Sequence, residues 1–241
     1  MKAYQLMDKS SEASTATGQD ITRRTYDDAQ FVSAFLAKNG RASEEIEVKP
    51  HVLAFAESLE GQRIIDIGCG PGIHARQFAS LGLEVVAIDY SEAMIQAAIS
   101  LTRSDHAPLY RTIDMRNIGE AFAPSSFDGA WVSASLIHVP EVDVPRVLKG
   151  IHRILVSDGQ VRISLKAGDQ RAQIVYDDKY GMGIEREFVF WEENNFAVLL
   201  RKAGFEITSI QKSEHGITGT EATKWLVFCA RAVKDSSPNA D

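Results

Sequence analysis

The stretch "RIIDIGCGPGIHARQFASLGLEVVAID", residues 63–89, decides the fold. Its two apolar runs are typical of buried strands, and the segment between them has the pattern of a helix. A glycine-rich turn joins the first strand to that helix. Glycines allow positive φ angles and a close approach of the backbone to a ligand, and the helix start offers N–H groups. The stretch therefore predicts a strand–helix–strand unit that holds a nucleotide-like ligand at its turn.

The same alternation of strand and helix patterns continues on both sides of this unit. Helices are expected at 24–39, 50–59, 91–103, 143–155 and 192–204, and further strands at 109–115, 127–134, 159–167, 205–212 and 223–230. Strands separated by helices are typical of parallel βαβ units, whereas the last two strands have no helix between them and are most simply antiparallel. The predicted fold class is α/β, an open, mostly parallel, doubly wound sheet with helices on both faces.

Composition narrows the class of protein and of partner. The chain has 241 residues, 24% of them charged, a net charge of −7 and two cysteines. No apolar run is long enough for a membrane span, and no signal peptide is recognisable, so the expected location is the cytoplasm. We expect a disordered leader at 1–20, a single domain at 21–232 and a flexible tail at 233–241. The acidic balance disfavours nucleic acid, so the expected partner is a small molecule, bound by a monomer or homodimer.

The glycine turn itself discriminates between nucleotide ligands. It lacks the GxxxxGK[ST] pattern of a phosphate-binding loop, and its GxGxG spacing places Ile73 where a dinucleotide fingerprint has its third glycine. Asp66 lies two residues before Gly68, where a carboxylate would repel a pyrophosphate but attract an ammonium or sulfonium group. Asp89 ends the next strand, where a carboxylate can accept both hydroxyls of a ribose. The turn therefore favours a cationic ligand that carries a ribose.

Five motifs extend this pattern along residues 60–166. They are "IIDIGCGPG", "VVAIDYSEAM", "RTIDM", "FDGAWVSASLIHV" and "VLKGIHRILVSDGQVRISL", and "LLRKAGFEI" and "KWLVFCA" continue them to about residue 230. With these motifs the chain resembles the class I S-adenosylmethionine-dependent methyltransferases, whose fold is Rossmann-like. The resemblance implies a seven-stranded sheet with its last strand antiparallel and an N-terminal helical lid. It also implies S-adenosyl-L-methionine as cofactor and S-adenosyl-L-homocysteine as product.

The resemblance also implies which residues bind the cofactor. Asp66 would serve the methionyl end through its ammonium or a bound water, Asp89 the ribose hydroxyls, and Asp114 the adenine amino group. The implied cofactor residues are Asp66, Gly68, Cys69, Gly70, Gly72, Arg76, Asp89, Tyr90, Met94, Asp114, Met115 and Ser133. Core packing for Met94, a turn role for Asp114 and a surface position for Arg76 stay open as alternatives.

Candidate catalytic residues are His138, after the fourth strand, and Tyr26, in the helix that covers the cofactor in related enzymes. Either could remove a proton from the acceptor, and packing is the alternative for both. The irregular segment 168–191 is expected to be a substrate-side insertion. Its candidate substrate-binding residues are Tyr176, Tyr180, Arg186 and Trp191, and a β-hairpin packed on the sheet is the alternative. Lys166, at the end of the fifth strand, would meet an acidic substrate group.

The predicted function is methyl transfer to an O or N atom of a small-molecule metabolite, with no metal required. "SASLIHVP" stands where amino-methylating enzymes of adenine, cytosine or glutamine carry an Asn/Asp-Pro-Pro-Tyr/Phe segment. Neither cysteine is placed for cytosine-C5 chemistry. The alternative is an RNA- or protein-modifying methyltransferase. That alternative predicts a basic groove near Arg23, Arg24, Lys166, Arg171 and Lys179.

Overall fold

The two apolar runs of residues 63–89 form adjacent parallel strands, β1 (Arg63–Ile67) and β2 (Glu84–Asp89), joined through α4 (Ile73–Ser80). Both strands are buried along nearly their whole length, as continuous apolar runs in a parallel sheet should be. The protein is represented by a computed structural model that describes residues 17–39, 47–103, 106–169, 171–178, 180–218 and 221–234. The parallel pairing of β1 and β2 around α4 confirms the strand–helix–strand unit that the sequence predicts.

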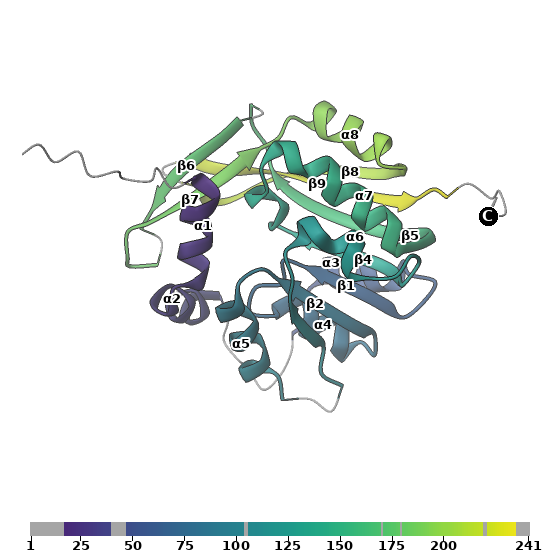
Figure 1. The fold of residues 1–241 in the computed structure, drawn as a ribbon, viewed down its shortest axis with the longest axis horizontal. Coiled ribbons are helices and arrows are strands. Elements are labelled where there is room, and N and C mark those ends of the chain that lie inside the picture. The colour runs from purple at the N-terminus through teal and green to yellow at the C-terminus, as the bar shows by residue number, and fades with distance from the viewer. Residues whose placement is uncertain are drawn as a thin grey trace, which may run out of the picture.

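The other elements follow the predicted order (Figure 1). The remaining helices are α1 (Gly18–Asp27), α2 (Ala29–Asn39), α3 (Pro50–Glu57), α5 (Glu92–Leu101), α6 (Ile118–Ala121), α7 (Val144–Ile154) and α8 (Glu193–Lys202). The remaining strands are β3 (Leu109–Thr112), β4 (Phe127–Ser133), β5 (Leu155–Lys166), β6 (Arg171–Asp177), β7 (Ile184–Phe190), β8 (Phe205–Thr218) and β9 (Glu221–Ala232). Within the described residues, no helix combines the length and apolarity needed to cross a bilayer.

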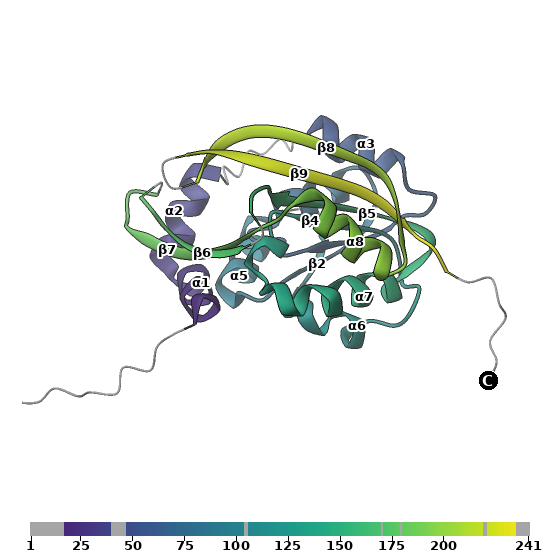
Figure 2. The same cartoon turned by 90° about the horizontal axis from the view of Figure 1, so that it is seen from above.

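Seven strands form one sheet in the order β3-β2-β1-β4-β5-β9-β8. The first five are mutually parallel, and β9 runs antiparallel to both of its neighbours. Figure 2 shows β8 and β9 running side by side as long strands. The predicted fold class is confirmed. Because the strand order reverses between β1 and β4, ligands are expected in the crevice at the carboxyl ends of these strands.

Helices cover both faces of this sheet and bury two separate clusters of apolar side chains. On one face α3, α4 and α5 enclose a cluster around Phe78 and Trp131. On the other face α6, α7 and α8 enclose a larger cluster that includes Leu148, Phe196 and Phe228. Both clusters lie against the strands, so they hold the strand ends in fixed positions.

The N-terminal region and segment 168–191 differ from expectation in detail. The helix expected at 24–39 is two helices, because the chain turns at Asp28, whose carboxylate accepts the amide of Phe31 at 2.8 Å. Helix α1 starts at Gly18, inside the expected disordered leader, because Thr17 and Asp20 form a capping box. Residues 1–16 and 235–241 lie outside the described residues. Segment 168–191 contains the hairpin β6–β7, a separate two-stranded sheet.

Candidate active site

Two cavities lie at the carboxyl ends of β1, β2 and β4, where the strand order predicts a ligand. The large cavity has a volume of about 360 Å³ and the small cavity about 270 Å³. Six residues line both, which makes the cavities neighbours: Gly68, Asp89, Tyr90, Met115, Ser135 and His138. The small cavity extends toward Asp114 beyond β3, and the large cavity extends toward Lys166 at the end of β5.

The glycine turn brings the backbone to the wall of the large cavity. Gly68 has a φ of 71°, and a Cβ there would lie 2.2 Å from the Cβ of Ser135. Gly70 has a φ of 52°, and a Cβ there would meet nothing within 4 Å. Gly68 is therefore required by packing, whereas Gly70 leaves open space for a ligand to approach the backbone.

Two buried carboxylates stand behind this turn. Asp89 accepts the amides of Gly70 and Ser91, each at 2.9 Å. Asp66 is 1% exposed, and its Oδ2 has no hydrogen-bond partner among the described residues. Burial raises the pKa of Asp66 to about 8, with a further contribution from the charge of Asp89. Burial also raises the pKa of Asp89 to about 6, against the lowering effect of its amide hydrogen bonds. Such a pair is stabilised by a cation or an ordered water beside it.

Asp114 lines the small cavity and is already engaged by Arg116. Its carboxylate accepts the amide of Arg116 at 2.9 Å and also pairs with the Arg116 guanidinium. Although burial raises the pKa of Asp114, the hydrogen bonds and charge of Arg116 hold it below its usual value. Arg116 also donates to Gln19 of α1 at 3.1 Å. Asp114 is thus held in place at the cavity wall as an ionised hydrogen-bond acceptor.

Helix α1 lies across the cleft and touches both sides of it. On the β7 side, Thr22 Oγ1 accepts the amide of Glu187 at 2.7 Å, and Thr25 Oγ1 donates to the carbonyl of Glu185 at 2.9 Å. On the other side, Ser91 Oγ, which caps α5, donates to the carbonyl of Tyr26 at 2.8 Å. These contacts fix the Tyr26 side chain in the wall of the large cavity.

Tyr26 and His138 meet in a hydrogen-bonded chain. The Glu187 carbonyl lies 2.8 Å from His138 Nδ1, and because a carbonyl only accepts, we assign the proton to Nδ1. His138 Nε2 then accepts from the Tyr26 hydroxyl at 3.1 Å, and Tyr26 Oη accepts from Arg186 at 3.2 Å. Burial, with the charges of Arg186 and Lys166, lowers the pKa of His138 to about 3. The ring is therefore neutral near pH 7, and Nε2 accepts the hydrogen bond from Tyr26.

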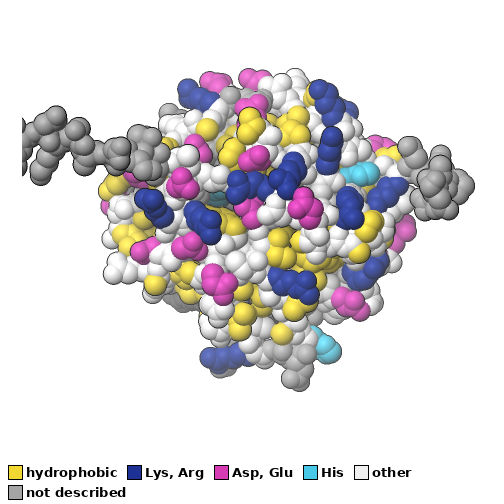
Figure 3. Space-filling model, in the orientation of Figure 1, with side chains coloured by type: hydrophobic (Ala, Val, Ile, Leu, Met, Phe, Trp, Pro, Cys, Tyr) yellow, Lys and Arg dark blue, Asp and Glu magenta, His cyan; other side chains and the backbone are white. Residues whose placement is uncertain are grey.

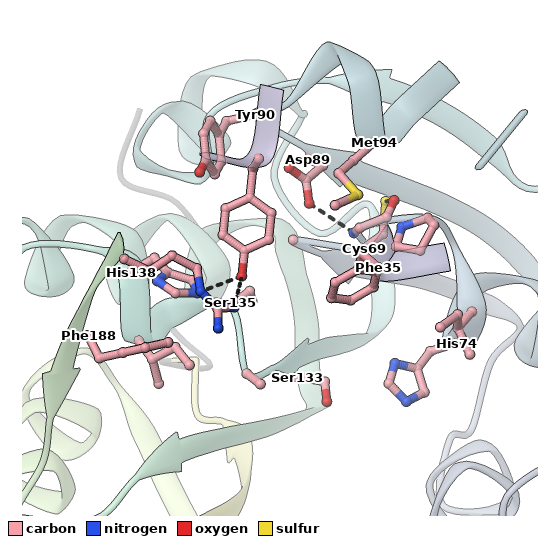
Figure 4. A pocket seen from close by; sticks show the side chains of 18 of the residues that line it. Phe35, Cys69, His74, Asp89, Tyr90, Met94, Ser133, Ser135, His138 and Phe188 are labelled. Carbon is pink, nitrogen blue, oxygen red and sulfur yellow. Dashed lines mark hydrogen bonds between the residues drawn. The ribbon is translucent and has the colours of Figure 1, made fainter. Parts of the chain in front are cut away.

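Figure 4 shows how the walls of the large cavity divide. His138 and Phe188 lie on one side, and Cys69, Asp89 and Met94 lie on the other. The sequence-predicted residues that line one or both cavities are Tyr26, Gly68, Cys69, Gly70, Asp89, Tyr90, Met94, Asp114, Met115, Ser133, His138, Lys166 and Arg186. Most of the expected cofactor residues and both expected catalytic residues are therefore brought together.

Other predicted residues lie outside both cavities. Asp66, which is 1% exposed, lines neither of them and lies behind the turn. Arg76 turns back to the carbonyl of Pro71 at 2.7 Å, and Gly72 caps α4. Trp191 is fully buried in the core, and Tyr176 is 64% exposed on the hairpin. The Tyr180 ring packs on Phe31 and Phe35 of α2, with centroids 5.2 and 5.6 Å apart. Tyr176 points away from the cavity because it pairs with Glu185, on the face of the hairpin opposite to that of Arg186.

Several residues that line the cavities were not singled out from the sequence. Ser135 follows β4, and its Oγ donates to the carbonyl of Ile67 at 2.7 Å, which ties the end of β4 to the end of β1. His215, Thr223 and Trp225 reach the large cavity from β8 and β9. The sequence predicted shorter strands at 205–212 and 223–230, so His215 fell outside them. Only the pattern "SASLIH", polar residues directly after a buried strand, could have pointed to Ser135.

Comparison with known proteins shows a likeness to methyltransferases. Residues 65–163 match the family model described as "Methyltransferase domain". The chain is similar in sequence over this region, and in fold, to S-adenosylmethionine-dependent methyltransferases. The family resemblance predicted from the sequence is confirmed. The matched region begins one residue before Asp66 and ends inside β5, so it includes the glycine turn and the strand ends that line the cleft.

Three similar proteins illustrate the extent of the likeness. A ubiquinone biosynthesis O-methyltransferase of Pseudomonas aeruginosa is 36% identical over 107 residues, 44% of this chain and 45% of the relative. The chain thus spans about half the length of the curated relatives it matches. A methyltransferase structure from Methanosarcina mazei has a TM-score of 0.67 at 21% identity, covering 78% of this chain and 100% of the other.

The third, a 1,6-didemethyltoxoflavin-N1-methyltransferase of Burkholderia thailandensis, has a TM-score of 0.64 at 21% identity and covers 95% of this chain and 99% of the other. That structure holds its substrate and S-adenosylhomocysteine. At these identities the solved structures show a shared fold and leave the acceptor open.

Proposed function

We propose that this methyltransferase binds S-adenosylmethionine across the two cavities and methylates an O or N atom of a small molecule in the large cavity. The observation that carries the proposal is the buried pair Asp66 and Asp89 behind the glycine turn. Two carboxylates, one with an oxygen lacking a partner among the described residues, favour a cationic ligand at that position. A dinucleotide pyrophosphate would be repelled there.

The residues along the strand ends suit the parts of this cofactor. Asp66 would meet the ammonium directly or through a water, Asp89 the ribose hydroxyls, and Asp114 the adenine amino group. Gly70 opens its backbone to the cleft, while Met94 and Met115 supply apolar wall. When bound, S-adenosylmethionine supplies a methyl group already activated by its sulfonium. The protein therefore needs mainly to align the acceptor and exclude water.

The acceptor's proton has a route into the protein. Tyr26 Oη would accept the proton lost by the acceptor while passing its own proton to His138 Nε2, 3.1 Å away. The Glu187 carbonyl, which holds Nδ1–H, orients the ring for this transfer. In this reaction the acceptor would gain a methyl group and lose a proton, and that proton would end on His138.

The alternative acceptor, RNA or protein, has less support. Of the five basic residues expected in a groove, Lys166 is 6% exposed and lies inside the large cavity, and Lys179 lies outside the described residues. In the view of Figure 3, basic and acidic side chains are interspersed over the surface. A cavity of about 360 Å³ suits a metabolite better than a polymer.

Calorimetric titration of S-adenosylmethionine tests the proposal. Asp89→Ala should weaken binding by about 1–3 kcal/mol, the magnitude of a hydrogen bond to a charged acceptor. Glu84→Ala is a matched control, because Glu84 is exposed at the opposite end of the same strand. It should leave the affinity unchanged. A parallel assay with methyl-labelled cofactor and a metabolite panel seeks the acceptor.

Lack of both cofactor binding and methyl transfer by the wild-type chain would refute the proposed function. An unchanged affinity in Asp89→Ala alone would show that Asp89 does not hold the ribose.

A further inference from the structure

Strand β7 has an edge whose backbone groups are bound by side chains instead of another strand. Within the described residues it belongs to a two-stranded sheet and pairs with β6 alone, so its other edge presents amides and carbonyls that need partners. Thr22 Oγ1 accepts the amide of Glu187 at 2.7 Å, and the carbonyl of Glu187 accepts from His138 Nδ1 at 2.8 Å. The backbone of Glu187 therefore links helix α1 to the ring of His138.

The hydroxyl of Thr22 has a fixed direction in this link. Thr22 is 2% exposed, and its Oγ1 donates to the carbonyl of Gly18 at 3.0 Å. Because its proton is committed to that carbonyl, the oxygen presents its lone pairs to the Glu187 amide. The Glu187 side chain lies against α1 as well, since a Cβ at Gly18 would collide with the Glu187 carboxylate. Helix α1 thus contacts both the backbone and the side chain of Glu187.

Tyr26 comes to His138 from the same helix. It lies four residues after Thr22, so the two side chains share one face of α1. Tyr26 Oη lies 3.1 Å from His138 Nε2. Helix α1 therefore acts on both ring nitrogens, on Nε2 through Tyr26 and on Nδ1 through Thr22 and Glu187. In a neutral imidazole one nitrogen donates and the other accepts, so these two contacts together select one arrangement of the proton.

We infer that Thr22 is a positioning residue: by binding the amide of Glu187, it keeps the proton of His138 on Nδ1. Nε2 then stays available to Tyr26. This inference rests on the proposed function, because His138 serves the reaction only if it receives the acceptor's proton. Without the Thr22 hydroxyl, the Glu187 backbone could turn away from the ring and the proton could move to Nε2. The route from Tyr26 would then be blocked at its last step.

The same link makes the base depend on the position of α1. Thr22 and Tyr26 both belong to this helix, so a movement of α1 away from β7 would remove both contacts from His138 together. His138 would be arranged to receive a proton only while α1 covers the cleft, which is also when water is excluded from it.

NMR spectroscopy of the His138 ring tests the inference without requiring turnover. Burial lowers the pKa of His138 to about 3, so the ring is neutral at pH 7. The long-range proton–nitrogen spectrum then distinguishes the protonated ring nitrogen from the unprotonated one. The His138 signals are assigned by their absence from the spectrum of His138→Gln. The wild type should carry the proton on Nδ1.

Variants of α1 then assign this arrangement to Thr22. Thr22→Val removes the hydroxyl and should move the proton of His138 from Nδ1 to Nε2, whereas Thr22→Ser keeps a hydroxyl and should restore the wild-type spectrum. Thr25→Val is the matched control, because it makes the same substitution on the same helix and removes the other bond to β7, at the carbonyl of Glu185. It should leave the proton on Nδ1. Thermal unfolding verifies that each variant is folded.

Three results would overturn the inference. They are a wild-type ring protonated on Nε2, a Thr22→Val spectrum like that of the wild type, and equal shifts in Thr22→Val and Thr25→Val. The last would assign the effect to a general loosening of α1.

Calorimetric titration of the wild type with S-adenosylhomocysteine separates this inference from the proposed function. If S-adenosylhomocysteine binds while any of the three results is found, the proposed function survives and the inference fails. If S-adenosylhomocysteine does not bind, the proposed function itself fails, whatever the arrangement of the His138 proton.

Discussion

The two halves of the cleft are built from different parts of the chain and carry opposite charge. The half that we propose to bind the cofactor uses the ends of β1, β2 and β3, where Asp66, Asp89 and Asp114 lie within 50 residues of one another. The half that we propose to bind the acceptor takes Lys166 from β5, Arg186 from the hairpin, and Tyr26 from α1. The comparison teaches that a cofactor site can be local in sequence, whereas an acceptor site depends on how distant elements pack.

The largest expected effect is on the cofactor half, through Gly68. In Gly68→Ala the new Cβ would lie 2.2 Å from Ser135 Cβ at a φ of 71°. Backbone strain and overpacking together should lower the free energy of unfolding by about 2–5 kcal/mol. Chemical denaturation measures this.

Gly70→Ala is the paired variant for the same turn. Its φ is also positive, but its Cβ meets nothing within 4 Å. It should destabilise the fold less and instead weaken cofactor binding, because its methyl group occupies the open cleft. Equal losses of stability in the two variants would contradict the distinction between a packed and an open glycine.

The next effect concerns the acceptor half, through His138. His138→Gln keeps a polar side chain but removes the ring nitrogen that receives the proton. The kcat for S-adenosylhomocysteine formation should fall about 100-fold or more, the usual contribution of a general base, with little change in cofactor affinity. His152→Gln is the control, because His152 lies on α7 and bonds the Val233 carbonyl at 2.9 Å, away from both cavities. Comparable rates for the His138 variant and the wild type would assign His138 to packing.

The smallest expected effect is on the pH dependence of thermal stability, through the carboxylates of Asp66 and Asp89. The pKa values of Asp66 and Asp89, about 8 and about 6, lie above the ordinary value of 3.8. A raised folded-state pKa gives stability that is complete below the unfolded pKa and is lost as pH rises through the folded pKa. The ligand-free Tm should therefore fall between about pH 4 and pH 8. In Asp66→Asn the fall should be smaller above pH 6.

Adding S-adenosylhomocysteine should reverse this trend, because its ammonium favours the ionised carboxylates. The increase in Tm on adding it should be larger at pH 8 than at pH 6. Thermal unfolding across this range, with and without the ligand, measures both quantities. Identical pH slopes for Asp66→Asn and the wild type would remove Asp66 from the cation site.

The sequence predicted the sheet and its order of elements well, for a local reason. Hydrophobic periodicity, Ser91 as a helix cap and the glycine turn act over a few residues, so the order of elements and Asp89 could be inferred directly. The antiparallel direction of β9 could be inferred because the sequence has no helix pattern between the last two strands. These short-range signals are the reason why the fold could be predicted from the sequence.

The acceptor half was predicted only in part because its geometry is not local. Tyr26, His138 and Arg186 were each singled out, but their meeting depends on α1 crossing to β7, which no spacing encodes. Within segment 168–191 the sequence offered several aromatic residues for the pocket wall and could not decide among them. Phe188 lines the large cavity and Tyr176 does not, because strand register decides which face of the hairpin each side chain occupies.

Helix α1 makes the two binding events interdependent. Its hydrogen bonds to β7 hold one margin of the cleft, and its bond to Ser91 holds the other. A ligand that packs against either side of this helix would restrict the movement of the helix away from the cleft. This restriction would lower the entropic cost of binding the second ligand. If cofactor and acceptor both pack against α1 as proposed, each would slow the escape of the other.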